Sequence, residues 1–71
     1  MFDFYNTKHR YTFAVEGLNV HDEVFASRAA ANNYMYQLIG KYNLQLTDVY
    51  DDHHFKTYIF AKGIRIHINR E

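Results

Sequence analysis

Apolar and polar residues alternate along the first part of the chain in the manner of β-strands. The segment RYTFAVEG, residues 10–17, predicts a strand. Its apolar side comprises Tyr11, Phe13 and Val15. Gly17 marks a turn, and the segment VHDEVFA predicts a second, shorter antiparallel strand. The apolar residues of this second strand that share one phase are Val20, Val24 and Ala26.

The pattern then changes to the spacing of three and four residues that is typical of an amphipathic helix. Ser27 is suited to cap the start of this helix, because its hydroxyl can accept a hydrogen bond from an early backbone amide. Asn43 can end the helix in the left-handed conformation. The apolar stripe of the helix consists of Ala31, Tyr34, Met35, Leu38, Ile39 and Tyr42.

The last part of the chain predicts three further strands. LQLTDVY is the first, and after the polar stretch DDHH the segment FKTYIFAKGIRIHINRE predicts a hairpin. We expect Lys62 and Gly63 to form a two-residue turn, with Ile59 opposite Ile66 and Phe60 opposite Arg65. In this register one face of the hairpin is apolar, with Phe55, Thr57, Ile59, Ala61, Ile64, Ile66 and Ile68.

These elements predict the order ββαβββ and a two-layer α+β fold, in which one helix packs on a small antiparallel sheet. Residues 1–71 are expected to form a single small domain. The helix stripe would pack on Phe13, Ile59, Ile66 and their neighbours, so the opposite face of the sheet would stay open.

The predicted open face is the candidate partner-binding site. It combines aromatic rings with cations on the last hairpin, at Lys56, Tyr58, Phe60, Lys62, Arg65, His67 and Asn69. Tyr, Phe and Arg are enriched in protein interfaces, which favours a protein partner. Rings flanked by cations can also stack the bases of single-stranded nucleic acid, which is the alternative. A third interpretation is cross-strand packing that only stabilises the sheet.

Composition narrows the choice of partner and location. The chain has no cysteine, seven tyrosines and six phenylalanines, which is more aromatic surface than so small a core needs. Eight basic and eight acidic residues give a net charge of zero, which argues against a general DNA-coating protein. A flat aromatic face on a marginal domain also fits a homodimer. We find no signal peptide and no membrane-spanning run, so a cytoplasmic protein is expected.

Catalytic and metal-binding patterns are weak. The stretches DDHH (Asp51, Asp52, His53 and His54) and HDE lack the spacing of a known metal site, and we interpret DDHH as a solvated turn. Histidines could act as general bases, as in small ribonucleases, at positions His9, His21, His53, His54 and His67. One helix on one sheet seldom forms a deep pocket, so we expect no enzyme activity, cofactor or metal.

The segments ASRAAANNYMYQLIGKYNL and DDHHFKTYIFAKGIRIHINRE give the chain an overall resemblance to small uncharacterised proteins encoded in bacteriophage genomes. The resemblance covers most of residues 10–71 and carries no assigned functional residues. It implies expression in a bacterial cytoplasm and a function of binding and blocking a host factor. The sequence therefore predicts a small non-enzymatic binding protein, an inhibitor of a host protein.

Overall fold

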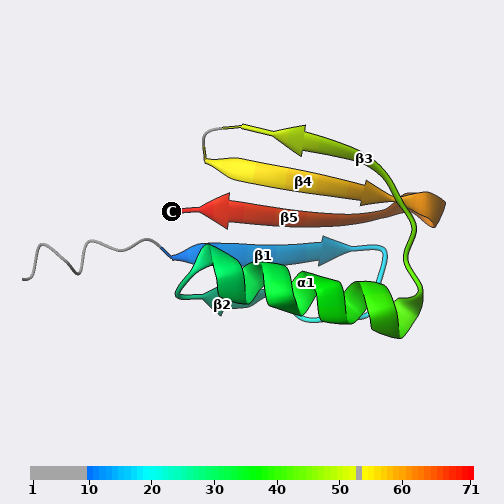
Figure 1. Cartoon of the computed structure of the whole chain (residues 1–71), viewed down its shortest axis with the longest axis horizontal. Coiled ribbons are helices and arrows are strands. Elements are labelled where there is room, and N and C mark those ends of the chain that lie inside the picture. The colour runs from blue at the N-terminus through cyan, green and yellow to red at the C-terminus, as the bar shows by residue number, and fades with distance from the viewer. Residues whose placement is uncertain (1–9, 53) are drawn as a thin grey trace, which may run out of the picture.

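The structure is a computed structural model that describes residues 10–52 and 54–71. The strands are β1 (Tyr11–Glu16), β2 (Glu23–Phe25), β3 (Leu46–Asp51), β4 (Phe55–Phe60) and β5 (Ile64–Arg70), with helix α1 (Arg28–Tyr42) between β2 and β3. All five strands form one antiparallel sheet in the order β2-β1-β5-β4-β3 (Figure 1). The predicted α+β fold and the order ββαβββ are confirmed.

The ends of α1 form as the sequence predicts. The hydroxyl of Ser27 accepts a hydrogen bond from the backbone amide of Ala30 at 3.1 Å. Asn43 takes the left-handed conformation with φ 53°, and its N–H donates to the carbonyl of Ile39. The helix runs along β1 and β2 on one side of the sheet (Figure 1). There the ring of Tyr34 packs edge-on against that of Phe13.

The core lies between α1 and the sheet. The neighbouring inner strands β1 and β5 of the sheet contribute side chains to this core from alternate positions, as a half-buried strand requires. The buried hydrophobic residues among those described are Phe13, Ala31, Met35, Leu38, Phe60, Ile64, Ile66 and Ile68. The second short strand departs from the prediction: Phe25 packs on Phe13 and Tyr34, whereas Val24 is exposed on the opposite face.

The register of the last hairpin differs from the predicted one by a single residue. Three residues, Ala61–Gly63, form the connection, so Phe60 pairs with Ile64 and Tyr58 pairs with Ile66. A shift of one residue turns every side chain of β4 to the other face of the sheet relative to β5. Tyr58 and Phe60 therefore share the helix side with the isoleucines, and Ile59 does not lie beneath the helix.

A glycine in the loop after β1 lies close to this connection. Gly17, in the loop after β1, has φ +90°, a backbone conformation that residues with a side chain rarely adopt. A Cβ atom added there would lie 3.0 Å from the carbonyl oxygen of Gly63 and 3.1 Å from Cα of Ile64. The two loops at this end of the sheet are thus in backbone contact.

Candidate functional site

The open face is the side of the sheet opposite α1. Cross-strand pairing places its described residues in three rows across the strands. The rows are Val24–Thr12–Asn69–Phe55, then Ala14–His67–Thr57–Tyr50, then Glu16–Arg65–Ile59–Asp48. We use "open face" for these residues.

The structure divides the predicted site between two sides of the sheet. Arg65, His67 and Asn69 lie on the open face as expected. Lys56, Tyr58 and Phe60 were expected beside them, and this part of the prediction is wrong, because these residues point to the helix side. Lys62 lies in the turn rather than on either face of a strand. The cause is the one-residue difference in register, which buries Phe60 at 2% exposure.

A polar network occupies the middle of the open face. The hydroxyl oxygen of Thr57 lies 3.0 Å from Nδ1 of His67, and Nε2 of the same imidazole lies 3.3 Å from a carboxylate oxygen of Glu16. A neutral imidazole with its proton on Nε2 satisfies both contacts, since it accepts from the hydroxyl and donates to the carboxylate. Arg65 lies 3.8 Å from the other oxygen of Glu16. The network joins β1, β5 and β4 and holds His67 in a defined orientation.

Apolar side chains lie on the β3–β4 half of the same face. Tyr50 is 55% exposed and Phe55 is 40% exposed, while Ile59 is half-buried between the neighbouring strands. Sequence reasoning did not select Tyr50 or Phe55 for this surface. Alternation within LTDVYD could have identified Tyr50 as facing away from Val49, but only the pairing of β3 with β4 shows that Tyr50 shares a face with Phe55 and Ile59.

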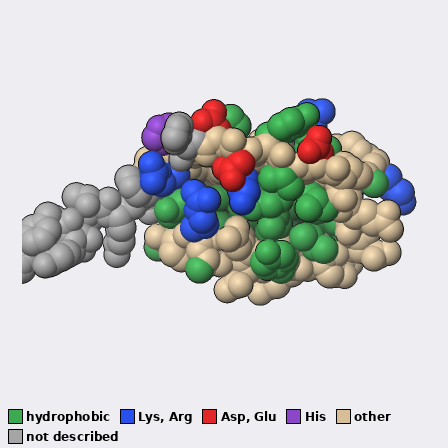
Figure 2. Space-filling model, turned by 45° about the horizontal axis from the view of Figure 1, so that its top comes forward, with side chains coloured by type: hydrophobic (Ala, Val, Ile, Leu, Met, Phe, Trp, Pro, Cys, Tyr) green, Lys and Arg blue, Asp and Glu red, His purple; other side chains and the backbone are tan. Residues whose placement is uncertain are grey.

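The helix side has an uncovered part as well, over β3 and β4. Leu46 is 52% exposed and Val49 is 36% exposed there, beside the half-buried ring of Tyr58. The ammonium of Lys56 lies 5.5 Å from the centre of the Tyr58 ring and 3.7 Å from the carboxylate of Asp51. Figure 2 shows hydrophobic side chains gathered in the middle of the molecule, with charged side chains above them and to either side.

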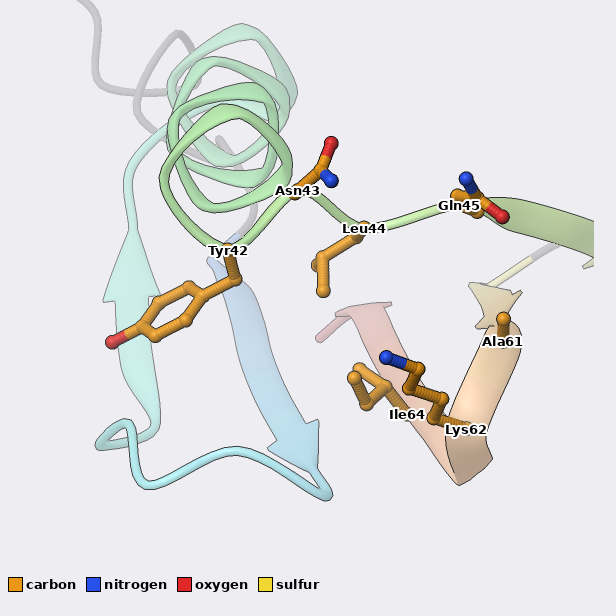
Figure 3. Close-up of a pocket in the computed structure, with 7 residues that line it drawn as sticks. All are labelled: Tyr42, Asn43, Leu44, Gln45, Ala61, Lys62 and Ile64. Atoms are coloured by element: carbon orange, nitrogen blue, oxygen red, sulfur yellow. The ribbon is translucent and has the colours of Figure 1, made fainter.

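A small pocket continues this uncovered part toward the end of α1. Its cavity volume is about 160 Å³, and Figure 3 shows Leu44 and Ile64 at its centre. The other lining residues are Tyr42, Asn43, Gln45, Ala61 and Lys62. The volume is below the roughly 300–1,000 Å³ that is typical of small-molecule sites, so the pocket suits a side chain of a partner better than a substrate.

The polar turn between β3 and β4 is held by ordinary contacts. The backbone N–H of Asp52 donates to the carbonyl of Phe55 at 2.9 Å, which closes the turn. A nitrogen of the Arg70 guanidinium lies 3.5 Å from the ring of His54. Within residues 10–52 and 54–71, no three side chains of the kinds that bind metals come together. The candidate bases His9 and His53 lie outside the described residues.

Comparison with known proteins gives no further guide to function. No family model, curated protein or solved structure matches the chain. No described helix is long and apolar enough to cross a membrane. The two sides of the sheet are therefore the basis for any functional argument.

Proposed function

We propose that this chain is a small non-enzymatic protein-binding module that contacts its partner through the open face. The observation that carries the proposal is the exposure of Tyr50 and Phe55 beside the Thr57–His67–Glu16 network on a sheet face that α1 does not cover. Protein interfaces combine apolar and aromatic side chains at their centre with polar groups around them. The complementary partner surface would be apolar over β3 and β4 and would offer hydrogen-bonding groups over β1 and β5.

Charge favours a protein over single-stranded nucleic acid as the partner. A nucleic-acid surface needs cations that are free to neutralise phosphates. On the open face the guanidinium of Arg65 is paired with Glu16, and Asp48 lies in the same row. Lys56 and Lys62, the cations expected beside the rings, lie elsewhere. The net charge of the whole chain is zero, which gives no general attraction to phosphates.

The class of partner belongs to the same proposal. The resemblance to small phage-encoded proteins supports a bacterial host protein as the partner, bound and inhibited in the host cytoplasm. A flat face without a deep pocket supports inhibition by covering a surface of the host protein.

The test is affinity capture from a nuclease-treated bacterial lysate, followed by titration calorimetry with the recovered protein. The site variant is Tyr50→Arg combined with Phe55→Ser. The control is Asn19→Arg, which changes an exposed residue in the loop between β1 and β2. We expect the wild-type chain and Asn19→Arg to bind with equal affinity, and the site variant to bind at least about 100-fold more weakly. Capture that is unaffected by the site variant, or lost on nuclease treatment, would refute the proposal.

A further inference from the structure

Between its first and last turns, the outer face of α1 carries no charge. Residues 29–40 contain no Asp, Glu, Lys, Arg or His, although solvent-facing helix surfaces are normally charged or strongly polar. The exposed positions in this stretch are Ala29, Asn33, Tyr36, Gln37 and Gly40. The Tyr36 ring is exposed, and a Cβ atom at Gly40 would meet nothing within 4 Å. Depletion of charge together with an exposed tyrosine is the composition of an interface centre.

Beside the helix, the same side of the sheet is covered only in part: Phe60 on β4 is buried, whereas Leu46 and Val49 on β3 are exposed. Figure 1 shows that α1 does not lie over β3 and β4. We call the uncovered part over these two strands the hollow, and its apolar residues are Leu46, Val49 and Tyr58. Two neighbouring strands span about 10 Å, which matches the diameter of one helix. The hollow therefore has the width of a single packed helix.

Helix and hollow lie next to each other on one face, so the profile of this face is a step. A second copy can be generated by a rotation of 180° about an axis parallel to α1. This rotation places α1 of the second copy over the hollow of the first, and α1 of the first copy over the hollow of the second. We propose that the chain forms a two-fold symmetric dimer in which α1 of each copy packs into the hollow of the other. The two helices then run parallel, and Tyr36 and Gly40 face β3 and β4 of the second copy.

Area and charge both fit this occupant. A helix of 15 residues is about 22 Å long, and helix and hollow together are about 20 Å wide. The flat footprint is then about 450 Å² per copy, so the two copies bury on the order of 1,000 Å², the lower bound for a specific interface. Charged groups stay at the margins: Arg28 and Lys41 lie at the ends of α1, and the Asp51–Lys56 pair lies at one end of the hollow.

The dimer is independent of partner binding. A net charge of zero means that two copies do not repel each other as whole molecules. Both helices lie between the two sheets, so the two open faces point outward and stay accessible. The assembly would present two partner sites on opposite sides, which can raise apparent affinity for a clustered or oligomeric target.

Sedimentation equilibrium of the full chain tests the dimer. We expect the wild-type chain to sediment at about twice its 8.5 kDa mass at micromolar concentration. Tyr36→Arg and Val49→Arg, both at exposed positions, should each weaken association at least about 100-fold with an unchanged circular dichroism spectrum. Tyr50→Arg, on the open face, should leave the dimer intact. A monomeric wild-type chain at 100 µM, or a dimer disrupted by Tyr50→Arg and not by Tyr36→Arg, would overturn the proposal.

Cross-linking tests the orientation separately. The chain has no cysteine, so the variant Gly40→Cys/Val49→Cys has thiols only at these two positions. We expect a short bis-maleimide to convert this variant into a covalent dimer. The matched variant Gly40→Cys/Thr12→Cys places the second thiol on the open face and should give far less product. Equal yields from the two variants would contradict the proposed packing.

Discussion

The register of the β4–β5 hairpin can be tested with two phenylalanines on one strand. Phe60 is 2% exposed and belongs to the core, whereas Phe55 is 40% exposed on the open face. Truncation of a fully buried phenylalanine to alanine costs about 3–5 kcal/mol, because apolar burial is lost and a cavity remains. Phe55 buries less area and borders solvent, so Phe55→Ala should cost about 1–2 kcal/mol at roughly 25 cal/mol per Å². A chain of 71 residues is stable by roughly 4–10 kcal/mol in total, so Phe60→Ala removes about half of it.

Urea denaturation followed by circular dichroism measures both losses at a protein concentration below that of association. The dependence of the unfolding free energy on urea should be the same for both variants if each still unfolds in one step. A two-residue turn would reverse the roles of the two rings, because it would place Phe55 on the helix side and Phe60 in solvent. A larger loss for Phe55→Ala than for Phe60→Ala would therefore show that the hairpin register, and the open face built on it, is wrong.

Three further substitutions have defined outcomes in the same urea assay. Gly17→Ala should destabilise the chain by at least about 2 kcal/mol more than Gly63→Ala, since both positions have positive φ but only a Cβ at Gly17 meets backbone atoms. Ser27→Ala should cost about 1 kcal/mol through loss of the helix cap, and Ser27→Asp should restore most of it. Thr57→Val should cost about 0.5–1.5 kcal/mol, because the ring nitrogen of His67 loses its hydroxyl partner, and an equal stability would contradict the network.

Local signals in the sequence were sufficient for the helix and for the order of elements. Ser27 and Asn43 end α1 because each satisfies backbone groups that have no partner within the helix, and this chemistry depends only on neighbouring residues. The spacing of Ala31, Met35 and Leu38 identified the buried stripe for the same reason, although Tyr42, which was expected to belong to it, is 39% exposed. These assignments depend little on tertiary contacts, so the ends and the buried stripe of α1 could be predicted from the sequence alone.

The register of the β4–β5 hairpin depends on which residues of the two strands pack together, and local sequence signals do not decide this. Lys62 and Gly63 have positive φ in the observed three-residue connection, and a two-residue turn requires the same, so Gly63 is compatible with both. Each strand alternates correctly in either register. The two registers differ in which residues of β4 join the isoleucines of β5, and the observed one buries the large side chain of Phe60 and half-buries that of Tyr58. The candidate site failed in part because this gain in buried area appears only once the helix is in place.

The shortage of covering elements accounts for both proposed surfaces. One helix covers about 10 Å of sheet, whereas five strands span about 24 Å, so α1 can cover only part of one face. On the open face, the central position next to Tyr50 and Phe55 is occupied by the satisfied Thr57–His67–Glu16 network, which tolerates water. In the hollow, Leu46 and Val49 face solvent beside the half-buried ring of Tyr58. We therefore expect a second copy to cover the hollow in the proposed dimer, because its α1 can supply the layer that is missing there, and the open face to stay available to a partner.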